Sequence, residues 1–191
     1  MNKTMKILML VLCFFVFAYC TIAQEKIYNI TTFGAKPNVE TVSTKPIQAA
    51  IDAASKNGGG MVVIPAGDFV SGTIILKNNV ELYLARGAEL LASTNHEDFP
   101  RQAQPKYRSQ KDDGGWYSLI YAEGAENIAI SGSGIIDGQG AKQTGRPNTP
   151  GGDRDGRSRN ILFISCKNIK ITGITLRNSA TWNQHYLDCE D

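Results

Sequence analysis

Two side chains in the C-terminal part of the sequence have types and spacing suited to binding a sugar. Trp182 carries an indole ring that could stack on a pyranose, and His185, three positions later, could bond a hydroxyl or carboxylate group. Both follow a strand-like segment. The alternative is that the two rings only pack a loop. We take Trp182 and His185 as the candidate substrate-binding residues.

The aspartates nearest to these residues in the sequence are weak candidates for a catalytic role. Asp137 stands in an expected turn before a glycine, where a short carboxylate usually bonds its own backbone. Asp188 and Asp191 flank Cys189 and also have the pattern of turn residues. His96 lies in an expected loop, and we assign it no role. We therefore assign no catalytic residue, and no metal ligand, within the sequence.

The elements that must position Trp182 and His185 recur along the chain. Runs of three to five β-branched and aliphatic residues alternate with tight Gly, Asn or Ser turns, and three of them open at Asn79, Asn127 and Asn168. A fourth begins at Cys189-Glu190-Asp191. The 23 residues from Cys166 to Cys189 suggest a coil of about 20–23 residues, and the 41 residues from Asn127 to Asn168 are interpreted as two coils.

Such a recurrence predicts an all-β fold, a parallel β-helix in which each coil buries its apolar face on the next. A β-sandwich is the competing all-β fold, but its strands would be longer, alternate more strictly and be joined by hairpins. The repeat would be incomplete at the C-terminal end, since the fourth stretch stops at Asp191.

One helix is predicted, before the first coil. Ser43 or Thr44 can cap it and Pro46 suits its first turn. Its apolar residues have helical spacing, and the glycines at 58–60 end it. The stripe consists of Ile47, Ala50, Ile51 and Ala54. We expect this helix to cover the exposed apolar end of the solenoid.

Two segments interrupt the repeat, residues 93–117 and 138–159, and both carry basic side chains with aromatic residues or glycines. Long loops on a rigid scaffold often hold binding residues, so an anionic or sugar ligand is one interpretation and a solvated loop is the other. Residues 24–191 contain 18 basic and 18 acidic side chains, a neutral balance that gives no argument for nucleic-acid binding.

Residues 1–23 have the pattern of a signal peptide: Lys3 and Lys6 precede an apolar run, and small residues follow at 21–23. An uncleaved N-terminal anchor is the alternative. We predict a secreted or periplasmic protein, with residues 24–191 belonging to one β-helix domain and no stable membrane association after cleavage. Cys166 and Cys189 would then either form a disulfide or occupy equivalent stacked positions on successive coils.

Several ordered segments together resemble the polygalacturonase family, glycoside hydrolase family 28. The resemblance runs through the whole of residues 24–191, and its most specific part is the glycine-rich run at 132–140. The segments are Thr32-Phe33-Gly34-Ala35, Gly58-Gly59-Gly60-Met61-Val62-Val63-Ile64-Pro65, Gly132-Ser133-Gly134-Ile135-Ile136-Asp137-Gly138-Gln139-Gly140, Asn160-Ile161-Leu162-Phe163-Ile164-Ser165-Cys166 and Gly173-Ile174-Thr175-Leu176-Arg177-Asn178-Ser179 with Trp182 and His185.

The resemblance implies a right-handed β-helix that hydrolyses α-1,4-galacturonosyl bonds in pectin with inversion and without a cofactor or metal. Its partner would be a pectic polysaccharide or oligogalacturonide. The family carries its three aspartates on Asn-Thr-Asp and Asp-Asp motifs followed by Gly-His-Gly and Arg-Ile-Lys, and this ordered set is absent here. The resemblance therefore places the catalytic aspartates beyond Asp191 and implies that these residues alone are inactive.

Two other functions remain open. A carbohydrate-binding β-helix without hydrolase activity would fit the same scaffold. A pectate lyase is a weaker alternative, because lyases of this fold normally use calcium-binding aspartate clusters and none is evident in the sequence. The family's usual tryptophan after Asp-Gly-Gln-Gly is replaced by Ala141, so the exact substrate and the endo or exo mode stay open.

Overall fold

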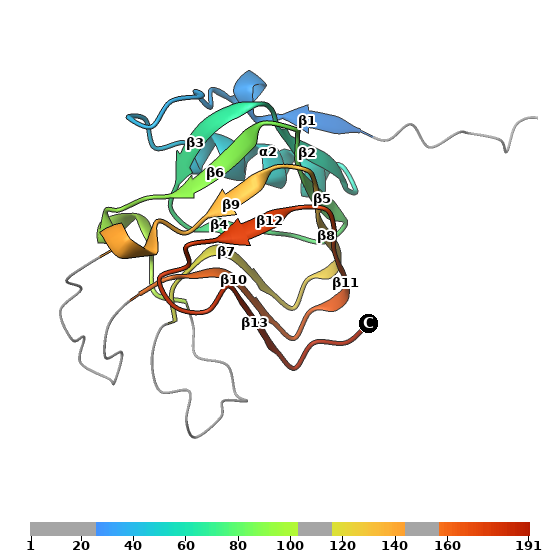
Figure 1. The fold of residues 1–191 in the computed structure, drawn as a ribbon. Coiled ribbons are helices and arrows are strands. Elements are labelled where there is room, and N and C mark those ends of the chain that lie inside the picture. The colour runs from blue at the N-terminus through green and yellow to red at the C-terminus, as the bar shows by residue number, and fades with distance from the viewer. Residues whose placement is uncertain (1–25, 103–115, 144–156) are drawn as a thin grey trace, which may run out of the picture.

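The computed structural model describes residues 26–102, 116–143 and 157–191. Its strands form three parallel sheets that the chain visits in turn, as in a right-handed β-helix (Figure 1). The first sheet contains β1 (Ile27–Asn29), β2 (Gly60–Ile64), β5 (Val80–Leu84), β8 (Glu126–Gly132) and β11 (Lys167–Ile171). The second contains β3 (Gly67–Ser71), β6 (Ala88–Ala92), β9 (Ile135–Asp137) and β12 (Thr175–Arg177). The third contains β4 (Ile74–Ile75), β7 (Ser118–Glu123), β10 (Arg159–Ile164) and β13 (Gln184–Leu187). The predicted fold class is confirmed.

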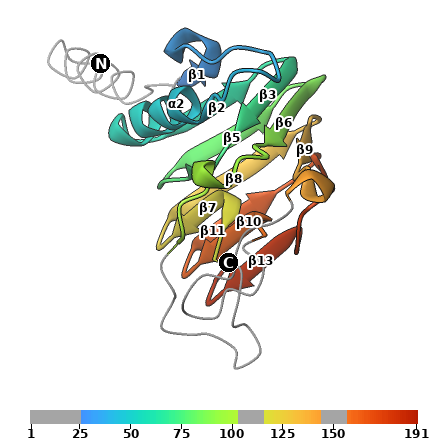
Figure 2. The ribbon, with the colours of Figure 1, turned by 90° about the vertical axis from the view of Figure 1, so that its left-hand side faces the viewer.

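The predicted helix is α2 (Thr44–Lys56), and it lies across the first coil at the N-terminal end of the stack (Figure 2). All four residues of its predicted apolar stripe are fully buried. Ser43 is the N-cap residue but its side chain makes no capping bond, while the Thr44 hydroxyl accepts a hydrogen bond from the Gly72 amide at 2.7 Å. The helix therefore shields the apolar end of the solenoid, as expected. Three short 3-10 helices complete the described elements: η1 (Ile30–Phe33), η2 (His96–Asp98) and η3 (Gly140–Lys142).

The coil length differs from the sequence-based expectation. Strand β8 pairs directly with β11, with Ile128 opposite Ile169, so the 41 residues from Asn127 to Asn168 make one coil and not two. The minimal coils do have the expected length: Gly60 lies opposite Val80, an offset of 20 residues. The long coils include extended connections between the second and third sheets, which hide the period in the sequence.

The recurring asparagines form a ladder along one corner of the solenoid. Asn79, Asn127 and Asn168 have φ angles of 61°, 56° and 51°, a left-handed conformation that asparagine tolerates better than most residues. Asn127 donates to the Asn79 side chain at 2.8 Å, and Asn168 donates to that of Asn127 at 2.7 Å. The bridge between Lys167 and Glu190 puts the next residue, Asp191, at the following rung. The predicted alignment of these stretches is confirmed.

Cys166 and Cys189 are both free thiols. Ile164 pairs with Leu187, so the residues two positions further on, Cys166 and Cys189, occupy equivalent places on successive coils. The stacked arrangement is confirmed and the disulfide is not formed. Residues 1–23, to which the signal-peptide prediction applies, lie outside the described residues. Within the described ranges, no helix has the length and apolar character needed to cross a bilayer.

Candidate functional site

The two predicted binding residues lie where the chain enters the last strand of the third sheet. Trp182 precedes β13 and His185 is its second residue, opposite Leu162 of β10. Because side chains alternate along a strand, Ile161 and Phe163 point into the main core while Leu162 and Ile164 point to the other face. His185 therefore shares the outward face of the third sheet with a small apolar cluster.

The structure brings the two predicted rings together. The indole of Trp182 and the imidazole of His185 meet edge to face, with ring centroids 4.6 Å apart and planes at 73°. Trp182 is half exposed, at 51%, whereas His185 is buried. Such a T-shaped contact is a favoured geometry for aromatic pairs. One indole ring is thus held by a buried neighbour while part of its surface faces solvent.

Two further residues join this cluster that the sequence interpretation did not single out. The guanidinium carbon of Arg159 lies over the Trp182 ring at 5.2 Å from its centroid and over the Trp116 ring at 5.9 Å. Arg159 and Trp116 are both buried. They lie at the ends of the two segments with basic side chains that were interpreted as possible ligand-binding loops, and residues 103–115 and 144–156 of those segments fall outside the described residues. The basic side chains of the two segments were the feature of the sequence that could have pointed to Arg159.

The loop that carries Trp182 is fixed through its backbone. The Asn160 side chain donates to the Asn183 side chain at 2.8 Å and to the Arg177 carbonyl at 3.1 Å. The Ser179 hydroxyl donates to the Trp182 carbonyl at 2.8 Å, and the Asn160 amide donates to the same carbonyl at 3.3 Å. Strand β10 therefore sets the position of β13 and also that of the loop before β13, which carries Trp182.

Asp137 belongs to a different face of the molecule. Its carboxylate accepts hydrogen bonds from the Gln139 amide at 2.8 Å, from Arg177 Nε at 2.7 Å and from the Asn178 side chain at 2.9 Å. Burial alone would raise the pKa of this carboxyl, but the Gln139, Arg177 and Asn178 donors and the Arg177 charge outweigh it and lower the pKa. The predicted turn role is confirmed, and all three donors hold the carboxylate in a structural network.

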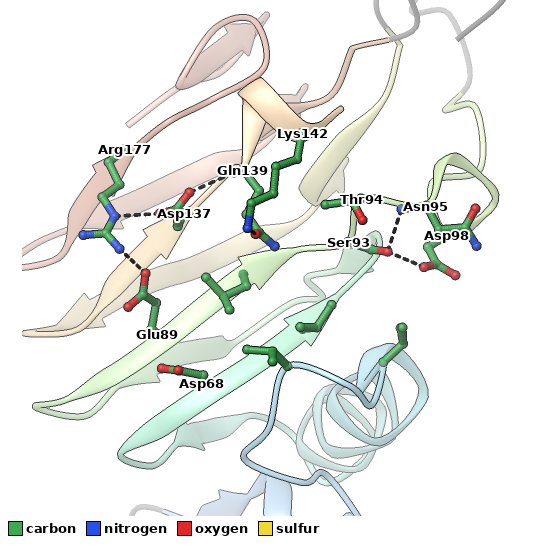
Figure 3. A pocket seen from close by; sticks show the side chains of 14 residues that line it. Asp68, Glu89, Ser93, Thr94, Asn95, Asp98, Asp137, Gln139, Lys142 and Arg177 are labelled. Carbon is green, nitrogen blue, oxygen red and sulfur yellow. Dashed lines mark hydrogen bonds and ion pairs between the residues drawn. The ribbon is translucent and has the colours of Figure 1, made fainter. Parts of the chain in front are cut away.

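This network lies at a groove of about 750 Å³ on the outer face of the second sheet (Figure 3). Arg177 also pairs with Glu89, so three neighbouring strands are linked across the groove by charge. The other two carboxylates near the predicted binding residues lie at a turn and at the chain end. Asp188 has φ 52° and accepts a hydrogen bond from the Ser165 hydroxyl at 2.8 Å, and Asp191 is the last residue of the sequence. Among the described residues, no three His, Cys, Asp or Glu side chains gather as a metal site.

Comparison with known proteins identifies the architecture. Residues 27–85 match the profile of the rhamnogalacturonase A/epimerase, pectate lyase-like family. The chain is 33% identical over 165 residues to a probable polygalacturonase of Vitis vinifera, covering 82% of this chain and 33% of that protein. A Parabacteroides merdae crystal structure assigned to the glycosyl hydrolases is 30% identical with a TM-score of 0.72, and covers 86% of this chain and 70% of that one. The family 28 exopolygalacturonase of Yersinia enterocolitica is 28% identical with a TM-score of 0.70, covering 87% of this chain and 37% of that one.

The chain belongs to the polygalacturonase family. It spans about a third of the length of the grapevine protein that it matches. In this polygalacturonase-family chain, the third sheet presents an exposed indole, a buried imidazole and a buried cation at one place. These groups can stack on, orient and hydrogen-bond a ligand.

Proposed function

We propose that this chain is the substrate-binding N-terminal portion of a polygalacturonase-type glycoside hydrolase, which cleaves α-1,4-galacturonosyl bonds in pectin with inversion. The observation that carries the proposal is the Trp182–His185 pair, backed by Arg159, on the outward face of the third sheet. The exposed face of the indole would stack on a galacturonosyl ring. His185 would bond a hydroxyl or carboxylate of the same sugar. The names of the relatives, polygalacturonase and exopolygalacturonase, support this substrate.

The chemistry requires a pair of carboxyl groups, and the contacts of Asp137 and Asp188 give neither of them that role. An inverting glycosidase needs an acid for the leaving oxygen and a carboxylate that activates water from the opposite face, about 6.5–9.5 Å apart. Asp137 is held by three donors on the second sheet, and Asp188 bonds Ser165 at a turn. We therefore propose that residues beyond Asp191 of the complete enzyme supply the catalytic aspartates. Alone, these 191 residues would bind substrate without cleaving it.

Binding can be tested through the intrinsic fluorescence of the chain, because it has two tryptophans and only Trp182 is exposed. We expect saturable quenching when the purified chain is titrated with oligogalacturonides. Trp182→Leu should abolish the signal, and His185→Ala should weaken binding. Ile27→Ala, which truncates an exposed apolar side chain at the opposite end of the solenoid, is the matched control and should bind like the wild type.

Two outcomes would contradict the proposal. Absence of saturable binding by the wild-type chain would remove the role of Trp182 and His185. Release of reducing ends from polygalacturonate by the chain alone would contradict the statement that its catalytic groups lie elsewhere. Saturable binding combined with a coding sequence that lacks an Asn-Thr-Asp motif within one further coil would instead favour the carbohydrate-binding β-helix.

We also propose that residues 1–23 direct export, so that the protein acts outside the cytoplasm. Their basic start, apolar run and small residues before Gln24 support this. Expression in a bacterial host followed by N-terminal sequencing should give a mature chain that begins at Gln24. Recovery of the uncleaved chain in the membrane fraction would favour an N-terminal anchor.

A further inference from the structure

Arg159 is a buried cation placed between the interior and the candidate binding site. It opens β10, its backbone amide donates to the Tyr117 carbonyl at 2.9 Å, and its side chain is almost fully covered, with 3% of the residue exposed. An arginine remains charged in proteins, and burying that charge is costly unless its surroundings compensate. The electron-rich faces of two indoles, both within 6 Å of the guanidinium carbon, supply part of that compensation.

The two indoles differ in what surrounds them. Trp116 is fully buried and packs with Leu162 and other residues on the outward face of the third sheet. Trp182 is half exposed and follows a loop. The Arg159 guanidinium therefore lies between the half-exposed indole of Trp182 and the fully buried indole of Trp116. His185 meets the Trp182 ring edge to face, and the Arg159 guanidinium lies over the same ring.

The backbone of the loop does not depend on this contact. Asn160 and Ser179 hold the backbone and neighbours of Trp182 through their own hydrogen bonds. Strand pairing also continues past Arg159, because Ile161 lies opposite Gln184. Removing the guanidinium would therefore free the ring of Trp182 while leaving the path of the loop intact.

We propose that Arg159 is a positioning residue, which holds the indole of Trp182 at one orientation and so presents a preformed stacking face to the ligand. A ring that is already ordered does not have to be immobilised when a sugar binds. Ordering one side chain on binding weakens affinity by about three- to tenfold. The expected effect of Arg159 on ligand affinity rests on the function proposed above. Its effect on the motion of the Trp182 ring does not.

The test compares Arg159→Met, Arg159→Lys and the control Arg86→Met in the full chain. Arg86 lies in the turn after β5, on another side of the solenoid. Time-resolved fluorescence anisotropy reports fast motion of the indoles, and acrylamide reaches only Trp182 because Trp116 is fully buried. We expect Arg159→Met to increase both the fast anisotropy component and the quenching constant. Arg159→Lys keeps the charge without the planar group and should lie between Arg159→Met and the wild type.

Oligogalacturonide titration gives the second readout. Arg159→Met should raise the dissociation constant about three- to tenfold with an unchanged number of sites, and Arg86→Met should leave it unchanged. Unchanged anisotropy and quenching in a folded Arg159→Met or Arg159→Lys variant would overturn the positioning role. If Arg159→Met does not fold, the Lys variant decides the question. If the wild type binds no oligogalacturonide, the proposed function fails while the anisotropy still decides the role of Arg159.

Discussion

Replacing Asp137 with asparagine tests whether this carboxylate is structural. Asparagine keeps the shape and can still accept the hydrogen bond from the Gln139 amide. Its NH₂ group, however, would face two donors, Arg177 Nε and the Asn178 amide. Two accepted bonds and one ion pair are lost. We expect Asp137→Asn to lower the free energy of unfolding without affecting oligogalacturonide binding.

The size of the expected loss in unfolding free energy follows from the interactions that Asp137→Asn removes. Each lost hydrogen bond to the carboxylate costs about 1–1.5 kcal/mol, and the ion pair adds little because the Arg177 side chain is 44% exposed and solvent screens it. The expected loss is therefore about 2–3 kcal/mol. With a urea dependence of roughly 2–3 kcal/mol per molar, the unfolding midpoint should fall by about 1 M. Asp68→Asn, an exposed carboxylate on β3, is the control and should change stability by less than about 0.5 kcal/mol.

The pH dependence gives an independent check of the same network. The pKa of Asp137 is lowered in the folded chain, so its contribution to stability is fully present above the unfolded value of about 3.9. That contribution is lost as the pH falls through the folded pKa. The difference between wild type and Asp137→Asn should be constant above about pH 4 and shrink in more acidic solution. Equal urea midpoints at pH 7, or a difference that persists unchanged into strong acid, would refute the reasoning.

Three further predictions concern the scaffold. Asn127→Ala should lower the free energy of unfolding by about 1–2 kcal/mol in urea denaturation, because alanine loses the ladder bonds and tolerates a positive φ poorly, while Asn127→Gly should cost less. Gly132→Ala should be far more harmful to the melting temperature than Gly124→Ala: a Cβ at 132 would lie 2.0 Å from the Leu84 carbonyl oxygen, whereas none of the described atoms lies within 4 Å at 124. Burial raises the pKa of the Cys166 thiol, so a thiol reagent at pH 8 should label it only upon unfolding; rapid labelling of Cys166 in the native chain, found by peptide mapping, would contradict its buried position.

The sequence was sufficient wherever structure depends on local pattern. Helix α2 follows from an apolar stripe and its terminating glycines, and the asparagine ladder follows from three short segments with the same residues before the same kind of strand. The coil count between Asn127 and Asn168 was wrong, because a long connection and a second coil add the same number of residues. Strand pairing decides between them, and pairing is a long-range property that sequence spacing does not contain.

The candidate site was predictable only in part, for the same reason. Trp182 and His185 are three residues apart and could be paired by inspection, but Arg159 and Trp116 come from earlier coils. Extending the register in which Ile161 lies opposite Gln184 places Arg159 beside Trp182. A reader of the sequence would need that register before the contact could be seen.

The site thus combines residues of three successive coils, with Trp116 before β7, Arg159 on β10 and the Trp182–His185 pair at β13, and it is only as well defined as the register between those coils. A slip of β13 by one residue along β10 would place Asn160 beside Trp182 and turn His185 toward the core. Two features oppose such a slip. Ile161 and Phe163 point inward, and the Asn160–Asn183 bond joins side chains that the observed alignment places side by side. Asn160 therefore fixes the register on which the contact between Arg159 and Trp182 depends, and with it the orientation of the exposed ring.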